Sequence, residues 1–90
     1  MKFIVRWNIP KASVVASEAR FIQTGAPPPP GVKMIGRWHG MSGGGVLIAE
    51  TDDAKALYSW LAIWNDLLEF ETTPCLEDAE AGPILGALKR

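Results

Sequence analysis

The residues best suited to chemistry lie around the single histidine. Arg37 and His39 are two positions apart in a segment that alternates like a β-strand, so both side chains are expected on one face. A guanidinium offers paired N–H donors that match a carboxylate, and an imidazole exchanges a proton near neutral pH. Together they predict a site for a small anionic or carbonyl ligand.

Other strand residues extend this polar patch. The alternation of the first strand places Arg6 on the same predicted face, and Glu69 and Glu71 belong to a strand expected beside it. The candidate ligand-binding residues are Arg6, Arg37, Trp38, His39 and Glu71. The alternative is that these charges only form cross-strand ion pairs, some of them at a dimer interface, because such pairs are common and usually carry no chemistry.

No side chain can be given a catalytic role from its spacing alone. As a general base His39 would need an orienting carboxylate, for which Glu50 and Glu71 are available; otherwise it is a strand-end histidine bonded to a turn carbonyl. One histidine and one cysteine are too few to bind zinc, and Cys75 is interpreted as a small apolar filler. We expect neither a cofactor nor a metal ion.

The composition is that of an ordinary globular domain. Of the 90 residues 48% are hydrophobic and 21% charged, with a net charge of −1. Basic residues are spread along the chain, so nucleic acid is not an expected partner. No apolar run approaches the roughly 20 residues that span a bilayer, the N-terminus becomes charged too early for a signal peptide, and a single cysteine excludes an internal disulfide. A cytoplasmic protein without membrane association is expected.

Apolar periodicity predicts four strands and two helices, followed by a tail. Strands are expected over residues 2–8, 32–39, 46–50 and 67–74, and helices over 11–24 and 54–64. Gly25 should end the first helix, and Thr51, Asp52 and Asp53 should supply the N-cap of the second. A third helix over 77–89 should be split at Gly82 and Pro83, and its apolar residues should dock on the domain.

Three segments between these elements have a predicted role. The prolines at 27–30 are interpreted as a stiff connector rather than a ligand for aromatic grooves. The glycine-rich run 40–45 predicts a hairpin loop, since a phosphate-binding loop would need a lysine and a following helix. Gly36 inside a strand suggests a bulge or the close approach of another group.

Each helix has a predicted inner stripe. For the first helix it consists of Ala12, Val15, Ala16, Ala19 and Ile22, with Val14 and Phe21 outside. For the second helix it consists of Ala54, Leu57, Tyr58, Leu61 and Trp64, with Trp60 and Ile63 outside. Trp60 and Trp64 could stack on a flat ligand, but aromatic residues at helical spacing more often serve as core or interface anchors.

The order βαββαβ predicts a single α+β domain over 1–90, a ferredoxin-like sandwich with an antiparallel four-stranded sheet, two helices on one face and a helical tail over 76–90. The other face of the sheet must be polar or covered. Four tryptophans, and apolar residues outside the helix stripes, are more than one small core hides. A homodimer is therefore expected.

Two runs of residues carry a resemblance to known proteins. The run GVKxxGRWHG over 31–40 and the run WxxxWxDLxxFExxP over 60–74, together with segments 24–29 and 50–53, resemble a family of short bacterial proteins that is a domain of unknown function. The resemblance extends from Met1 to about Glu80 and implies no activity. The layout is also similar to the dimeric α+β barrel superfamily, in which two sheets usually pack open face to open face.

Members of that superfamily include cofactor-free monooxygenases, haem-handling proteins, small isomerases and ligand sensors, so the resemblance does not select one chemistry. The leading hypothesis is a homodimeric domain that binds a small molecule or mediates an interaction. The alternative is a small cofactor-independent enzyme, similar to those monooxygenases or isomerases, that uses His39 and Arg37. A third hypothesis is a purely structural assembly domain.

Overall fold

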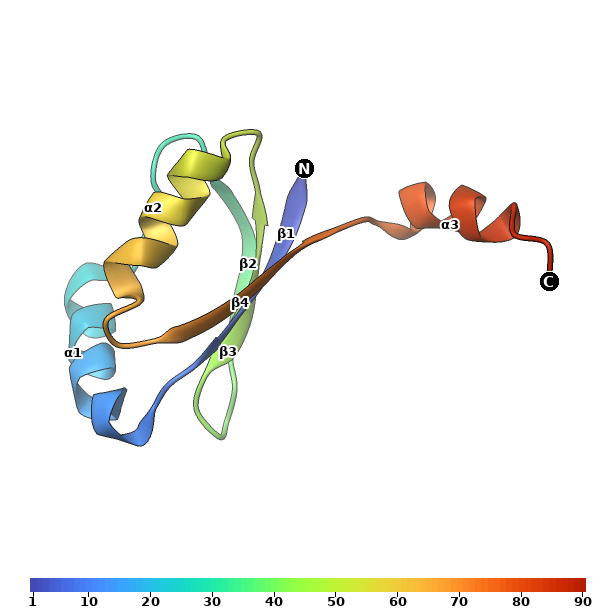
Figure 1. Ribbon diagram of the computed structural model, residues 1–90. Coiled ribbons are helices and arrows are strands. Elements are labelled where there is room, and N and C mark those ends of the chain that lie inside the picture. The colour runs from blue at the N-terminus through green and yellow to red at the C-terminus, as the bar shows by residue number, and fades with distance from the viewer.

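The architecture is a two-layer sandwich. A computed structural model describes residues 1–90 and contains one antiparallel sheet in the order β2-β3-β1-β4. Its strands are β1 (Lys2–Asn8), β2 (Lys33–His39), β3 (Gly45–Glu50) and β4 (Glu69–Cys75). Helices α1 (Val14–Thr24) and α2 (Ala54–Trp64) cover one face of the sheet (Figure 1). The predicted α+β, ferredoxin-like βαββαβ fold is confirmed.

The helices begin and end at the residues that local chemistry favours. Pro10 precedes a short 3₁₀ turn, η1 (Lys11–Ser13), that leads into α1. Gly25 ends α1 in the left-handed conformation, with φ of 72°, which glycine adopts without strain. The Asp53 side chain accepts hydrogen bonds from the backbone N–H groups of Lys55 and Ala56, both at 3.1 Å, and so caps α2.

The inner faces of both helices differ from the predicted stripes. In α2 the buried side chains are Leu57, Trp60 and Trp64, whereas Tyr58 is exposed. Two indoles bury more apolar area than a phenol, whose hydroxyl is better hydrated, so the helix turns its tryptophans toward the sheet. Trp60 is therefore a core residue and not, as predicted, an outer one.

In α1 the predicted stripe faces outward. Val15 and Ile22 are 80% and 83% exposed, while Ser17 is buried and Phe21 half-buried. An alanine-rich stripe offers little area to bury, so the helix presents the larger Phe21 instead. Burial of Ser17 is tolerated because its hydroxyl donates a hydrogen bond to the Val14 carbonyl at 3.0 Å.

A bulge in β2 decides which side chains face the helices. The pairing of β2 with β3 shifts between Met34 and Gly36, so Met34 lies opposite Ala49 but Arg37 lies opposite Leu47. Ala49 and Leu47 are both buried beneath the helices. The extra residue, Ile35, reverses the alternation of the strand.

The prediction that Arg37 and His39 share the open face with Arg6 is therefore wrong. Both point toward the helices, and Trp38 takes the open face. The prediction for Gly36 is a bulge or the close approach of another group, and both are found at this position. A Cβ atom at Gly36 would lie 2.5 Å from the Trp38 indole, so only glycine lets that ring lie over the strand.

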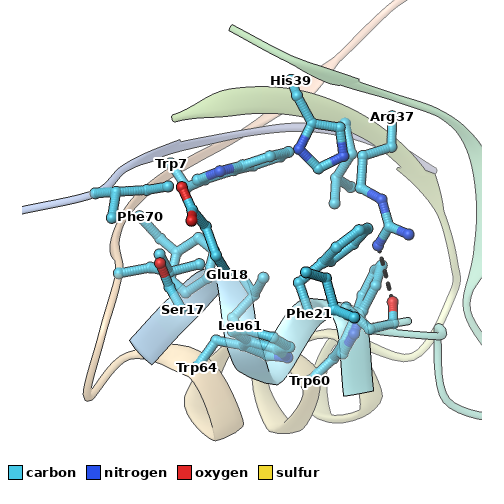
Figure 2. A pocket seen from close by; sticks show the side chains of 15 residues that line it. Trp7, Ser17, Glu18, Phe21, Arg37, His39, Trp60, Leu61, Trp64 and Phe70 are labelled. Atoms are coloured by element: carbon cyan, nitrogen blue, oxygen red, sulfur yellow. Dashed lines mark hydrogen bonds between the residues drawn. The ribbon is translucent and has the colours of Figure 1, made fainter. Parts of the chain in front are cut away.

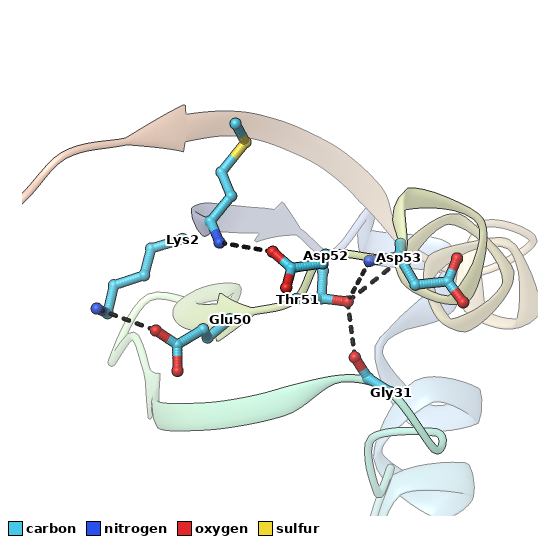
Figure 3. A network of polar contacts seen from close by, with 7 residues as sticks. Lys2, Gly31, Glu50, Thr51, Asp52 and Asp53 are labelled. Atoms are coloured by element: carbon cyan, nitrogen blue, oxygen red, sulfur yellow. Dashed lines mark hydrogen bonds and ion pairs between the residues drawn. The ribbon is translucent and has the colours of Figure 1, made fainter.

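The loop before β2 is tied to the start of α2. The prolines at 27–30 form no helix or strand and connect α1 to β2, and the run 40–44 is a hairpin loop, both as predicted. Buried Thr51 donates a hydrogen bond to the Gly31 carbonyl at 2.7 Å and accepts one from the Asp53 N–H at 2.9 Å (Figure 3). Thr51 thus joins the proline connector to the start of α2.

The tail stands apart from the domain. Helix α3 (Asp78–Gly86) continues through Pro83, whereas the sequence predicts a break there, and none of its residues is buried. Pro83 removes the amide partner of the Ala79 carbonyl, and because Ala79 is exposed, water can replace that partner, which reduces the cost of the proline. The expectation that the tail docks on its own domain is also wrong, because α3 projects away from the sheet (Figure 1). No helix has the length and apolarity needed to cross a membrane.

Replacing Thr51 tests the connector. Thr51→Val keeps the side-chain shape but leaves the Gly31 carbonyl and the Asp53 N–H without their partner. The free energy of unfolding should fall by about 1 to 2 kcal/mol, as measured by urea denaturation. Thr72→Val is the matched control, since the Thr72 hydroxyl makes no hydrogen bond and the residue is exposed. Equal stabilities of the two variants would contradict the role of Thr51.

Candidate functional site

A cavity of about 390 Å³ lies between the sheet and the two helices (Figure 2). Of its 15 lining residues 11 are hydrophobic, and the size falls within the range of small-molecule pockets. Its aromatic walls come from Trp7, Phe21, Trp60, Trp64 and Phe70. Its polar groups come from Ser17, Glu18, Arg37 and His39.

Trp7 forms the wall on the sheet side, and a glycine makes room for it. Trp7 in β1 lies opposite Gly45 in β3, where a Cβ atom would come within 2.5 Å of the indole. In Figure 2 the indole faces the cavity from the side opposite Trp60 and Trp64. The space between these rings is therefore bounded by aromatic surface on both sides.

His39 stands at the mouth of the cavity. Its ring meets Phe21 edge-on, with centroids 5.0 Å apart, and Trp7 in the same manner at 5.8 Å. The residue is exposed, and its imidazole nitrogens make no hydrogen bond to the protein. Both nitrogens are thus available to a bound molecule. The strand-end alternative, in which a turn carbonyl holds the ring, is not realised.

Arg37 is a half-buried cation held by neutral groups. Its Nη1 donates to the Ala26 carbonyl at 2.8 Å and its Nη2 to the Gly25 carbonyl at 3.0 Å, and its guanidinium lies 5.0 Å from the centre of the Phe21 ring. These carbonyls follow the C-terminal end of α1, where the helix dipole favours a cation.

Arg37 has no carboxylate counter-charge. Every ion pair of the structure is formed elsewhere, by Met1, Lys2 and Arg20. Burial lowers the pKa of Arg37, although a guanidinium stays protonated in proteins. Two of its five N–H groups serve the carbonyls, so donors remain for an anion at the cavity.

An ion pair between the helices supports the far wall. Arg20 in α1 donates to both carboxylate oxygens of Asp66, at 2.9 and 2.8 Å, and to the Ile63 carbonyl at 3.0 Å. The same guanidinium lies 5.2 Å from the centre of the Trp64 ring. The hydrogen bond from Arg20 lowers the pKa of Asp66, and the pair fixes α1 to the end of α2.

The structure brings together only part of the predicted site. Arg37 and His39 line the cavity, but Arg6, Trp38 and Glu71 lie on the opposite face of the sheet, where Arg6 is paired in register with Glu71. Glu71, on that face, and Glu50, which pairs with Lys2 at 3.2 Å, cannot orient His39. The carboxylate that lines the cavity is Glu18.

Several cavity residues are absent from the predicted set. Trp60 and Trp64 are considered for stacking on a flat ligand, and both do line the cavity. The spacing of Trp7 and Phe21 carries no signal of a cavity, because it depends on how α1 packs over β1. Arg20 and Asp66 are 46 positions apart, and a long-range pair of this kind has no local pattern. The structure contains no cluster of three or more His, Cys, Asp or Glu suited to a metal ion.

Comparison with known proteins places the whole chain in one family. A family profile described as "Domain of unknown function (DUF3303)" matches residues 1–89. No curated protein shows significant similarity to the chain.

The pair between α1 and α2 has a pH signature. Because the pKa of Asp66 lies below its ordinary value of 3.8, the folded state gains stability from the ionised carboxylate above that pH. This contribution is lost as the pH falls through the lowered pKa. Asp66→Asn should therefore lower the Tm at neutral pH, and the difference from the wild type should shrink in acid.

Thermal denaturation followed by circular dichroism between neutral pH and about pH 2 measures this change. Glu18→Gln is the control, because Glu18 is exposed and forms no ion pair. A difference between wild type and Asp66→Asn that stayed constant down to the lowest pH would show that the ion pair is not its cause.

Proposed function

We propose that this chain, which belongs to the DUF3303 family of domains of unknown function, is a homodimeric domain that binds a small, flat, mostly apolar molecule carrying one anionic or carbonyl group. One observation carries this proposal. The cavity has aromatic walls and, at one end, a half-buried arginine without a carboxylate partner. The volume of the cavity limits the size of the ligand, its aromatic walls favour a flat shape, and the arginine favours a negative charge.

The walls favour a flat apolar body. Trp7 faces Trp60 and Trp64 across the cavity, so a planar molecule can contact aromatic surface on both sides (Figure 2). Aromatic pairs in stacked or edge-to-face arrangements contribute about 0.5 to 1.5 kcal/mol each beyond the area they bury. Water gains few hydrogen bonds in a cavity with 11 hydrophobic lining residues, so its displacement by an apolar ligand is favourable.

Arg37 and His39 favour an anion or a carbonyl at one end. Arg37 brings a positive charge and unused N–H donors to a partly desolvated position, where a charge-assisted hydrogen bond is stronger than in water. His39 adds a nitrogen at the mouth that is free to donate. A carboxylate would supply the counter-charge that the protein itself does not provide to Arg37.

The homodimer is proposed from exposed apolar surface. The open face of the sheet carries the half-buried Ile4, Val46 and Ile48 at its centre, next to Trp38, which is 58% exposed. Burying such apolar surface against a partner is favourable. The ligand cavity lies on the other face of the sheet, so each protomer has a complete cavity of its own.

A second candidate function is catalysis without a cofactor. The observation that favours it is that His39 and Glu18 line the same cavity, which gives a proton acceptor and a carboxylate close to a bound molecule. In that case Arg37 would stabilise developing negative charge. Chemical change of a bound ligand, abolished by His39→Gln with binding intact, would distinguish the enzyme from a binding domain.

A matched pair of probes tests the ligand class. We expect 2-naphthoate to bind more tightly than 2-naphthamide, which has the same flat body but no charge, as measured by quenching of tryptophan fluorescence. Arg37→Met should weaken 2-naphthoate binding about tenfold, as expected for one charge-assisted hydrogen bond, and leave 2-naphthamide binding nearly unchanged.

Arg6→Met is the control, because Arg6 lies on the open face and should not affect either probe. If Arg37→Met does not fold, Arg37→Lys keeps the charge, loses the forked donors and should show an intermediate affinity. Equal binding of both probes to the wild type would remove the anion from the proposal. Absence of binding by either probe would argue against a ligand cavity of this class.

A further inference from the structure

Helix α3 is too short and too exposed to be stable on its own. It has nine residues, includes Gly82 and Pro83, and buries none of its side chains. Isolated helices of this length are marginal in water, and a proline inside one costs still more. Ile84 and Leu85, 59% and 60% exposed, project from it, and Leu88 follows just beyond its end; these three residues form the apolar ridge of the tail. A helix with such side chains requires a surface on which to pack.

Its own domain does not supply that surface. β4 remains paired with β1 up to Cys75, which lies opposite Lys2, and only Leu76 and Glu77 separate it from α3. Glu77 and Glu80 form a capping box, and Glu77 also pairs with Lys2 at 3.2 Å. These contacts direct α3 away from the domain, on the side opposite α1 and α2 (Figure 1).

The open face of the sheet has the complementary chemistry. Its apolar centre consists of Ile4, Val46 and Ile48, with Trp38 exposed beside them. Lys33 and Arg6 lie on this face opposite Glu50 and Glu71 but form no ion pair with them, whereas the first turn of α3 carries Asp78 and Glu80. An apolar ridge preceded by two acids can therefore match an apolar centre bordered by two cations that form no ion pair within the chain.

We propose that two copies of the chain exchange their tails, with α3 of each protomer lying across the open sheet face of the other. This inference rests on the proposed homodimer and specifies how it forms. A two-fold axis makes the exchange reciprocal, so each protomer both donates a helix and receives one. The exchange covers the open face and the ridge of α3 at once, which explains why neither is covered within one chain.

The donated helix is tested by adding charge to its ridge. The double variant Ile84→Glu/Leu85→Glu should sediment as a folded monomer of about 9.8 kDa at micromolar concentration, where the wild type sediments as a dimer. Its far-ultraviolet circular dichroism should otherwise remain native, because α3 lies outside the core. Val15→Glu/Ile22→Glu, on the equally exposed surface of α1, is the control and should remain dimeric.

The receiving face is tested separately by Trp38→Glu, which should also be monomeric. A mixture of the two monomeric variants should then form a heterodimer, because the intact α3 of Trp38→Glu can pack on the intact face of Ile84→Glu/Leu85→Glu. Only one of the two exchanges is restored, so this heterodimer should be weaker than the wild-type dimer. Pairing of two open sheet faces without α3 does not predict this restoration, because one of the two faces would still carry the Trp38→Glu change.

The outcomes separate this inference from the proposal on which it rests. A wild type that remains monomeric overturns both the dimer and the exchange. A dimer that survives Ile84→Glu/Leu85→Glu overturns the exchange and leaves the homodimer standing. A dimer that is lost only in the control Val15→Glu/Ile22→Glu places the interface on α1 and likewise overturns the exchange.

Discussion

The bulge in β2 is the constraint on which the rest of the structure depends. One extra residue, Ile35, reverses the side-chain alternation between Met34 and Gly36. It sends Arg37 and His39 under the helices and leaves Trp38 on the open face. Without the bulge the cavity would have no cation, and Trp38 would occupy the space beside Phe21. The polar end of the cavity and the exposed tryptophan of the open face are therefore both consequences of one irregularity in one edge strand.

Two glycines make this arrangement possible on opposite faces of the sheet. Gly36 leaves room for the Trp38 indole, and Gly45 leaves room for the Trp7 indole. In each case the missing Cβ atom allows a large ring to lie flat over the neighbouring backbone. The aromatic cavity wall and the exposed tryptophan thus depend on the smallest residue at a single position each.

Charge is distributed unevenly between the two faces. On the helix side, the half-buried Arg37 is held by the carbonyls of Gly25 and Ala26 but has no anion beside it. The Arg20–Asp66 pair, by contrast, is complete and serves to fix α1 against α2. On this side of the sheet the protein thus gives Arg20 a carboxylate partner and Arg37 none. On the open face Arg6 and Lys33 lie opposite Glu71 and Glu50 in register.

The features that could be predicted from the sequence are those of local structure, because they depend on neighbouring residues. The four strands, the first two helices, the cap at the start of α2, the end of α1 at Gly25 and the glycine hairpin each depend on a few neighbouring positions, and all are found as predicted. The order of these elements was sufficient for the ferredoxin-like layout, because short connections leave few ways to pair four strands. Membership of the family also follows from the sequence.

The directions of the side chains, by contrast, depend on packing between segments that are distant in the sequence. The inner face of α1 depends on competition between an alanine-rich stripe and a single Phe21 for the same sheet. The face to which Arg37 points depends on a bulge in β2. Gly36 suggests that a bulge is present, but its exact position decides the face of every later side chain in the strand. The Arg20–Asp66 pair and the path of α3 depend on contacts between distant segments. Alternation predicts that residues two apart share a face, but one inserted residue changes which face that is.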